Sequence, residues 1–172
     1  MSNLFADLDP HNIDIRYWDV SNVENMSFMF LCCENFDCDL SGWDVSNVVF
    51  MERMFLHCKN FNCDLSGWDV SNVEDMYYMF YDCKKFTGEG LNRWKTIKCK
   101  NMKSMFSDCE NFDCDLSGWD VSNVENMKRM FAGCIKFRGK GLDEWKPIKC
   151  EYMRHMFDEC SSLNRYPSWY KE

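Results

Sequence analysis

The sequence predicts an α/β repeat solenoid of about six units, each with one short strand region and one short helix. Three observations carry this prediction: evenly spaced tryptophans, a fixed order of methionine, phenylalanine and cysteine after each tryptophan, and a change of hydrophobic period within each copy. A unit of this size cannot bury its own apolar face, whereas stacked units cover one another. A solenoid with ladders of identical side chains is therefore expected.

Tryptophan marks the repeat. All seven tryptophans stand 24 to 26 residues apart, at Trp18, Trp43, Trp68, Trp94, Trp119, Trp145 and Trp169. Every methionine except Met1 falls eight or eleven residues after a tryptophan, and phenylalanine follows the second of each pair. Cysteine comes three residues later, as in Met29-Phe30-x-x-Cys33. Methionine fills irregular core gaps and a buried thiol packs as a small hydrophobe, so these ladders are assigned to the core.

Each copy shows two hydrophobic periods. After Trp18, apolar residues recur at spacings of three and four through Cys33, which predicts a helix of about three turns. Ser21 and Glu24 fit a capping box at its start. The stretch 36–45 alternates instead and slips once near Gly42, which indicates a strand with a bend.

The sequence predicts one solenoid domain over residues 1–172. Residues 18–163 hold six repeats of 25–26 residues, between an N-terminal cap at 1–17 and a C-terminal cap at 164–172. Terminal repeats need atypical sequence to cover their cores. The residues expected to do so are Leu8, Ile13 and Ile15 at the start, and Tyr166, Trp169 and Tyr170 at the end.

The string Phe55-x-x-Cys58-x-x-Phe61-x-x-x-Leu65-x-x-Trp68-x-Val70-x-x-Val73 resembles the BspA-like leucine-rich-repeat family. It is most similar to the mycoplasma-type surface-protein repeat, whose units read much like Trp-Asp-Val-Ser-Asn-Val-x-x-Met-x-x-Met-Phe. The resemblance covers about residues 14–163. It implies a leucine-rich-repeat-like solenoid with an adhesion or host-interaction role, and it supplies no catalytic residues.

Composition excludes several classes of function. A net charge of −8 opposes a general phosphate-backbone binder, so no nucleic-acid partner is expected. No apolar run approaches the roughly eighteen residues of a membrane helix, so no membrane insertion is expected. The three histidines are scattered and the glycine pairs at 88–90 and 139–141 read as turns. The chain is therefore predicted to be no enzyme and to hold no catalytic, cofactor or metal site.

Twelve cysteines leave three interpretations open. Buried thiols are favoured, because the cysteine after each Met-Phe pair shares the apolar phase, with Cys32 one position off it. Disulfides and zinc remain alternatives, since Cys33 and Cys38 form a pair that recurs in two further copies. The N-terminus lacks a basic and a long apolar segment, which favours an intracellular or virion location over secretion. The resemblance alone would imply the cell surface.

Acidic and amide side chains also recur. Asp19, Asp39 and their equivalents would form stripes, for which turn chemistry is favoured over calcium binding or a basic partner. The asparagines at 22, 47, 72 and 123 are expected to stack and bond loop backbone.

The outward helix positions change along the chain, which favours a protein-binding role. The predicted interface is an aromatic and apolar stripe of Phe28, Leu31, Phe50, Leu56, Tyr77, Tyr78 and Tyr81. Later copies carry a predicted basic patch of Lys100, Lys103, Lys128, Arg129 and Arg154. The stripe would bind a protein partner or a second copy in a homodimer, unless residues 1–12 fold back over it.

The sequence thus predicts a non-enzymatic protein–protein interaction module. The alternative is a structural or self-assembling component, for example of a virion.

Overall fold

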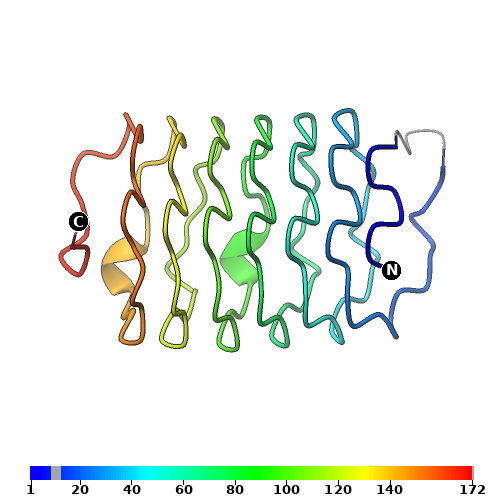
Figure 1. Cartoon of the computed structure of the whole chain (residues 1–172), viewed down its shortest axis with the longest axis horizontal. Coiled ribbons are helices and arrows are strands. Elements are labelled where there is room, and N and C mark those ends of the chain that lie inside the picture. Colours follow the sequence, from blue (N-terminus) through cyan, green and yellow to red (C-terminus); the bar gives the residue numbers. More distant parts are fainter. Residues whose placement is uncertain (9–12, 172) are drawn as a thin grey trace.

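The chain winds into a row of coils stacked along the long axis, with the N-terminus at one end and the C-terminus at the other (Figure 1). The computed structural model describes residues 1–8 and 13–171. Within these ranges the helices are two short 3₁₀ helices, η2 (Leu91–Arg93) and η3 (Leu142–Glu144). The same ranges contain no strand beyond isolated bridges, and no helix in them has the length and apolar character to cross a membrane.

The predicted fold class is wrong: the units are not helix-and-strand units. Where the helix was expected, the backbone makes successive turns. The N–H groups of Val23, Met29 and Cys33 each donate to the carbonyl three residues earlier, at 2.9, 3.2 and 3.1 Å. Such turns space buried side chains three and four residues apart, as a helix does, so the hydrophobic period fitted both structures.

Residues in the left-handed conformation prevent a helix from running through these turns. Phe28 (φ 61) and Cys32 (φ 58) adopt positive φ, and equivalent residues do so in the later coils. A left-handed residue cannot continue a right-handed helix, and it fits the third position of a type II turn. The predicted capping box at Ser21 therefore has no helix to cap.

The coils bond to one another through every second peptide of this segment. The N–H groups of Phe28, Phe30 and Cys32 donate to the carbonyls 24 residues later, at 2.9, 2.9 and 2.8 Å. The intervening peptides close the turns within the coil. Isolated parallel bridges such as Asn25↔Phe50 connect successive coils at one residue each. Residues 36–45, where the strand was predicted, have only turns and irregular backbone.

The predicted core ladders are confirmed. One phenylalanine per coil stacks on the next at 5.5 to 5.8 Å between ring centroids, from Phe5 and Phe30 to Phe157. Each tryptophan from Trp43 on donates its indole N–H to a carbonyl of the preceding coil, as Trp43 does to Ile15 at 3.0 Å. These bonds fix the register of the stack while the rings fill it.

The two longer copies form η2 and η3. Gly90 (φ 87) and Gly141 (φ 88) precede them in the left-handed conformation. A Cβ on Gly141 would lie 2.1 Å from the Ser117 nitrogen of the preceding coil. Glycine is therefore required there by both backbone conformation and close approach.

The first residues extend the core. Phe5 donates its N–H to the Met29 carbonyl at 2.9 Å and stacks on Phe30, so residues 1–8 act as the end of a further copy. The hypothesis that the N-terminus covers the outer stripe is wrong for residues 1–8, and residues 9–12 lie outside the described chain. Of the expected cap residues, Ile15 is buried while Leu8 and Ile13 are exposed.

At the other end, Trp169 stacks on Trp145 at 5.9 Å, and Tyr166 and Tyr170 pack against Phe157 at 5.6 and 5.0 Å. The C-terminal segment thus covers the last core rings, and residue 172 lies outside the description.

Candidate interaction surface

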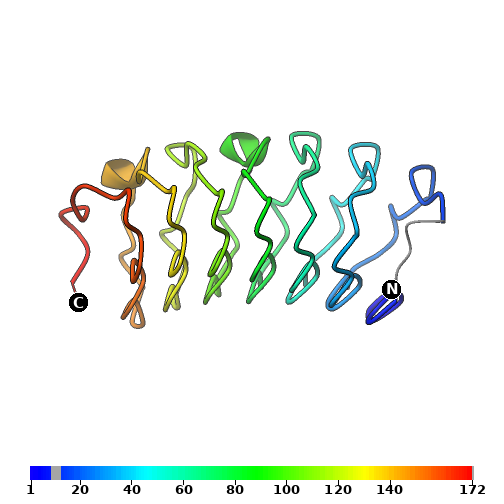
Figure 2. The same ribbon diagram turned by 90° about the horizontal axis from the view of Figure 1, so that it is seen from above.

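The side chains of the turn segments that do not belong to the core ladders lie on one side of the stack, which we call the turn face; Ser27, Ser104, Ser107 and Ala132 are buried members of it. It comprises the outward positions of residues 27–32, 52–57, 77–82, 103–108, 128–133 and 154–159. Residues 1–8, which bond to the first of these segments, lie on the side opposite η2 and η3 (Figure 2). Because the coils are in register, each outward position forms a row along the stack.

Three rows carry most of the predicted site residues. Row one is Phe28, Arg53, Tyr78, Ser104, Arg129 and His155. Row two is Leu31, Leu56, Tyr81, Ser107, Ala132 and Asp158. Row three is Ser27, Glu52, Tyr77, Lys103, Lys128 and Arg154. All residues of row one have positive φ, between 52 and 61, so their side chains project from equivalent turns.

The aromatic stripe is interrupted by a cation. The Arg53 guanidinium carbon lies 5.2 Å from the ring centroid of Phe28, 4.8 Å from Tyr77 and 5.8 Å from Tyr78. The Lys103 ammonium lies 5.1 Å from the Tyr77 ring. Cations over ring faces are attracted by the ring quadrupole, so the surface is a mixed aromatic and cationic cluster. Sequence reasoning missed Arg53, although its alignment with Phe28 and Tyr78 was visible in the repeat.

The remaining residues of the predicted stripe fall into two rows. Leu31, Leu56 and Tyr81 are successive members of row two and half-buried. Phe50 is 44% exposed but belongs to a different row, where it bridges Asn25 and Asp75. Phe50 therefore does not share a row with any other predicted interface residue.

Four of the five residues of the predicted basic patch lie close together. Lys103, Lys128 and Arg154 are successive in row three, and Arg129 is exposed beside them in row one. Lys100 follows Glu74 in another row and pairs with it at 2.6 Å. Lys100 is thus engaged in an ion pair and does not lie with the other four residues of the predicted patch.

The recurrent aspartates and asparagines serve the backbone, as the favoured interpretation predicted. Asp19 and Asp44 accept the N–H of the serine two residues later, at 3.1 and 3.0 Å, and other copies repeat this turn. Asn47 and Asn72 donate to loop carbonyls of the preceding coil at 2.8 and 2.7 Å. Lys140 holds the pKa of Asp115 down at about 2 by hydrogen bonding. These acidic stripes are explained by turn chemistry.

The cysteine ladder is buried, as predicted. Cys58 and Cys83 donate their thiol groups to the carbonyls of Phe30 and Phe55 at 3.0 Å, and each ladder cysteine makes the equivalent bond. Burial raises the pKa of both thiols well above its usual value. Cys32, expected to be more exposed, is half-buried. Across residues 1–8 and 13–171, no group of three or more His, Cys, Asp or Glu side chains could hold a metal ion.

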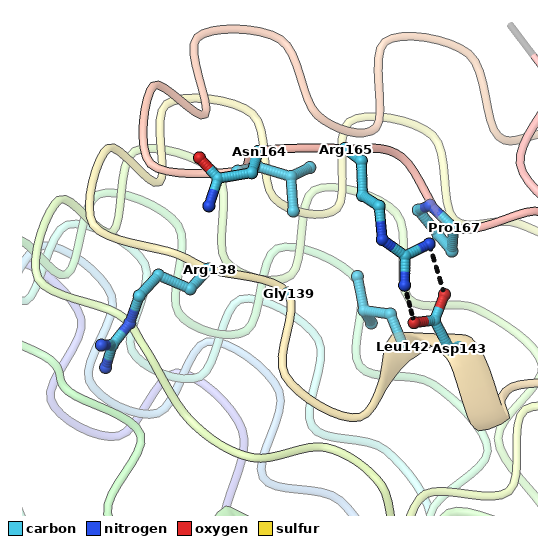
Figure 3. Close-up of a pocket in the computed structure, with 8 residues that line it drawn as sticks. Arg138, Gly139, Leu142, Asp143, Asn164, Arg165 and Pro167 are labelled. Atoms are coloured by element: carbon cyan, nitrogen blue, oxygen red, sulfur yellow. Dashed lines mark hydrogen bonds and ion pairs between the residues drawn. The ribbon is translucent and has the colours of Figure 1, made fainter.

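A hollow of about 210 Å³ lies at the C-terminal end (Figure 3). Asp143 and Arg165 form an ion pair across it, beside Leu142 and Pro167. Arg138, on its rim, pairs with Asp113. Because each of these charged groups already has a partner, this hollow is explained by the attachment of the C-terminal segment to η3.

The family model described as "Mycoplasma protein of unknown function, DUF285" matches residues 1–90 and 86–171. The two matches together span nearly the whole chain. No curated protein matches the chain, and no solved structure does.

Proposed function

The chain belongs to the DUF285 family of Mycoplasma proteins of unknown function, and from that premise we propose that it is a non-enzymatic module that binds another protein through the turn face. The similarity of its units to mycoplasma-type surface-protein repeats supports an adhesion or host-interaction role.

The contrast between core and surface carries the proposal. Inward positions hold the same methionine, phenylalanine and cysteine in nearly every coil. Row one instead changes from Phe28 through Arg53 and Tyr78 to Ser104. Packing does not require this variation, because the backbone bonds of the turns are the same in each coil. Variable side chains on a constant scaffold are where binding specificity resides.

The chemistry of the cluster suits a protein partner. Tyr77, Tyr78 and Arg53 are residue types enriched at the energetic centres of interfaces. They are half-buried and already in contact through the Arg53 guanidinium, so little side-chain freedom remains to be lost on binding.

Site-specific photocrosslinking in the native cell tests the proposal. A photoreactive phenylalanine replaces Leu56 on the turn face, and the matched control replaces Arg93 in η2, which is exposed on the opposite side. We expect position 56, and not position 93, to crosslink a different protein.

Crosslinks from position 56 to a second copy alone would support the alternative, a self-assembling structural component. A partner captured only from position 93, or from neither position, would refute binding through the turn face.

A further inference from the structure

The turn face contains a hollow of about 200 Å³ between the coils of Tyr78 and Glu159. Tyr78 and Tyr81 line one part of it, Ser104 and Asp108 lie in the next coil, and Glu159 lies two coils further along. The hollow is separate from the Arg53 cluster, although both include Tyr78.

Small residues create this hollow. Ser104 occupies the row-one position that holds Arg53 and Arg129 in other coils. Ala132 stands in row two, where the first two coils have leucine. Gly133 has φ 76, and a Cβ there would lie 2.4 Å from the Asp108 Oδ1 atom. The space therefore results from successive departures from the large side chains of the earlier copies.

One residue that lines this hollow has a buried polar atom without a hydrogen-bond partner. Ser104 is 1% exposed, and its hydroxyl is the one buried side-chain oxygen or nitrogen in the described chain without a hydrogen bond. An unsatisfied buried hydroxyl costs about 1–3 kcal/mol, so such groups are normally satisfied. Ser104 lines the hollow, but its hydroxyl has almost no accessible surface in this rotamer, so a ligand would satisfy it after rotation about the Ser104 χ1 bond.

The charges of the lining select the ligand. The lining includes three carboxylates, of Asp108, Asp158 and Glu159, and one guanidinium, that of Arg129. His155 Nδ1 lies 3.0 Å from Asp158 Oδ2, so this carboxylate has one further neighbour. Burial and the neighbouring Asp108 raise the pKa of the Tyr81 hydroxyl, which keeps it neutral. Arg53 and Lys103 already lie 5.8 and 5.9 Å from the Tyr78 ring, so the rings add little attraction for a further cation. The excess of carboxylates among the lining residues is what favours a cation over a neutral or anionic ligand.

We propose that this hollow receives a basic side chain, arginine or lysine, of the partner protein. Its cationic head lies among the carboxylates and donates to the Ser104 hydroxyl, and its hydrocarbon stem packs against Tyr78 and Tyr81. This inference rests on the proposed function, because it names the chemistry that the turn face recognises.

Blocked tripeptides test the site without the partner. The probes are acetyl-Gly-Arg-Gly-amide, its lysine equivalent, and the citrulline equivalent as the neutral control, with binding followed by tyrosine NMR shifts. We expect the two cationic peptides to bind with Kd on the order of 1 mM, and the citrulline peptide at least about tenfold more weakly.

Variants locate the binding. Ala132→Leu restores the leucine of the first two coils and fills the hollow, and Asp158→Asn removes one carboxylate. Each should weaken arginine-peptide binding about tenfold. Glu144→Gln, on exposed η3, is the matched charge control and should leave it unchanged.

Equal binding of the citrulline peptide, no binding of any peptide, or binding unaffected by Ala132→Leu would overturn the proposal. Binding of methyl hexosides in place of the peptides would overturn it in favour of a saccharide site. Crosslinking of a partner from position 56 does not depend on these probes. If a partner is still crosslinked from position 56 but no peptide binds, the basic-side-chain site is rejected while binding through the turn face stands.

Discussion

Truncation of one ring in the middle of the phenylalanine stack should cost far more than truncation at its end. Phe80 is fully buried, and its ring lies 4.3 Å from Phe86, 5.5 Å from Phe55 and 5.7 Å from Phe106. Replacing a buried phenylalanine with alanine removes its burial and leaves a cavity, which costs about 3–5 kcal/mol. The close-packed neighbours on both sides place Phe80→Ala at the upper end of that range.

Phe5→Ala is the matched comparison. Phe5 occupies the equivalent position in the first segment, but among residues 1–8 and 13–171 its ring stacks on Phe30 alone, at 5.5 Å, and contacts Trp18 at 5.6 Å. With one neighbouring coil instead of two, we expect about half the loss, roughly 2 kcal/mol.

Urea unfolding followed by near-ultraviolet circular dichroism measures both variants. In a stack, each coil is stabilised mainly by its two neighbours, so Phe80→Ala should also separate the unfolding into two transitions. Phe5→Ala should shift a single transition. Losses equal within about 0.5 kcal/mol, both with one transition, would refute nearest-neighbour coupling through the rings.

Four further outcomes are expected. Burial raises the pKa of Asp75 in the folded chain, so the folded state loses stability as pH rises from the ordinary aspartate pKa to the raised folded value. Asp75→Asn should therefore gain free energy of unfolding relative to the parent as pH rises through that interval, and a difference that does not change with pH would contradict this. An aromatic disulfide reagent should modify Cys32 before Cys63, whose pKa burial raises to about 12, and both before Cys83; simultaneous reaction would mean global opening. Deleting residues 164–172 should expose Trp145 and cause aggregation, measured by light scattering, whereas an equally soluble truncation would place the cap elsewhere. Arg129→Gly should exceed Arg129→Ala in stability by about 0.5–1 kcal/mol on thermal unfolding, because only glycine relieves the left-handed backbone; the reverse order would contradict the assigned strain.

The sequence was sufficient to predict the repeat and its core. Trp43, Met54 and Phe80 lie in ladders because identical residues at a constant spacing must stack when the coils are in register. The secondary structure could not be obtained in the same way. The spacing of Met26, Met29 and Cys33 is common to a helix and to successive turns, and nothing in the side chains at 28 and 32 signals positive φ. Phenylalanine and cysteine are uncommon in that conformation, so tertiary contacts between coils override the local preference.

The sequence predicted several of the residues on the turn face, but not which of them lie side by side. The helix assignment placed Phe28, Phe50 and Tyr78 on one face, whereas in the turns Phe50 belongs to another row. In the sequence, the charge of Arg53 sets it apart from the aromatic residues that it contacts in the structure. The hollow is not evident from the sequence, because small residues such as Ser104 become informative only when they are aligned with the large residues of equivalent coils.

The left-handed positions give an independent reason to regard the turn face as selected for more than folding. A residue other than glycine in this conformation costs roughly 1–2 kcal/mol, and the greater chain entropy of glycine offsets only about 0.5–1 kcal/mol of that. Backbone energetics therefore favour glycine at each such turn position. The described turn segments follow this preference at Gly133 but retain Phe28, Arg53 and Tyr78 at equivalent conformations. Side chains kept against the backbone preference, on the face where the copies differ most, are a further argument for the proposed binding role. The glycine at position 133 lines the hollow.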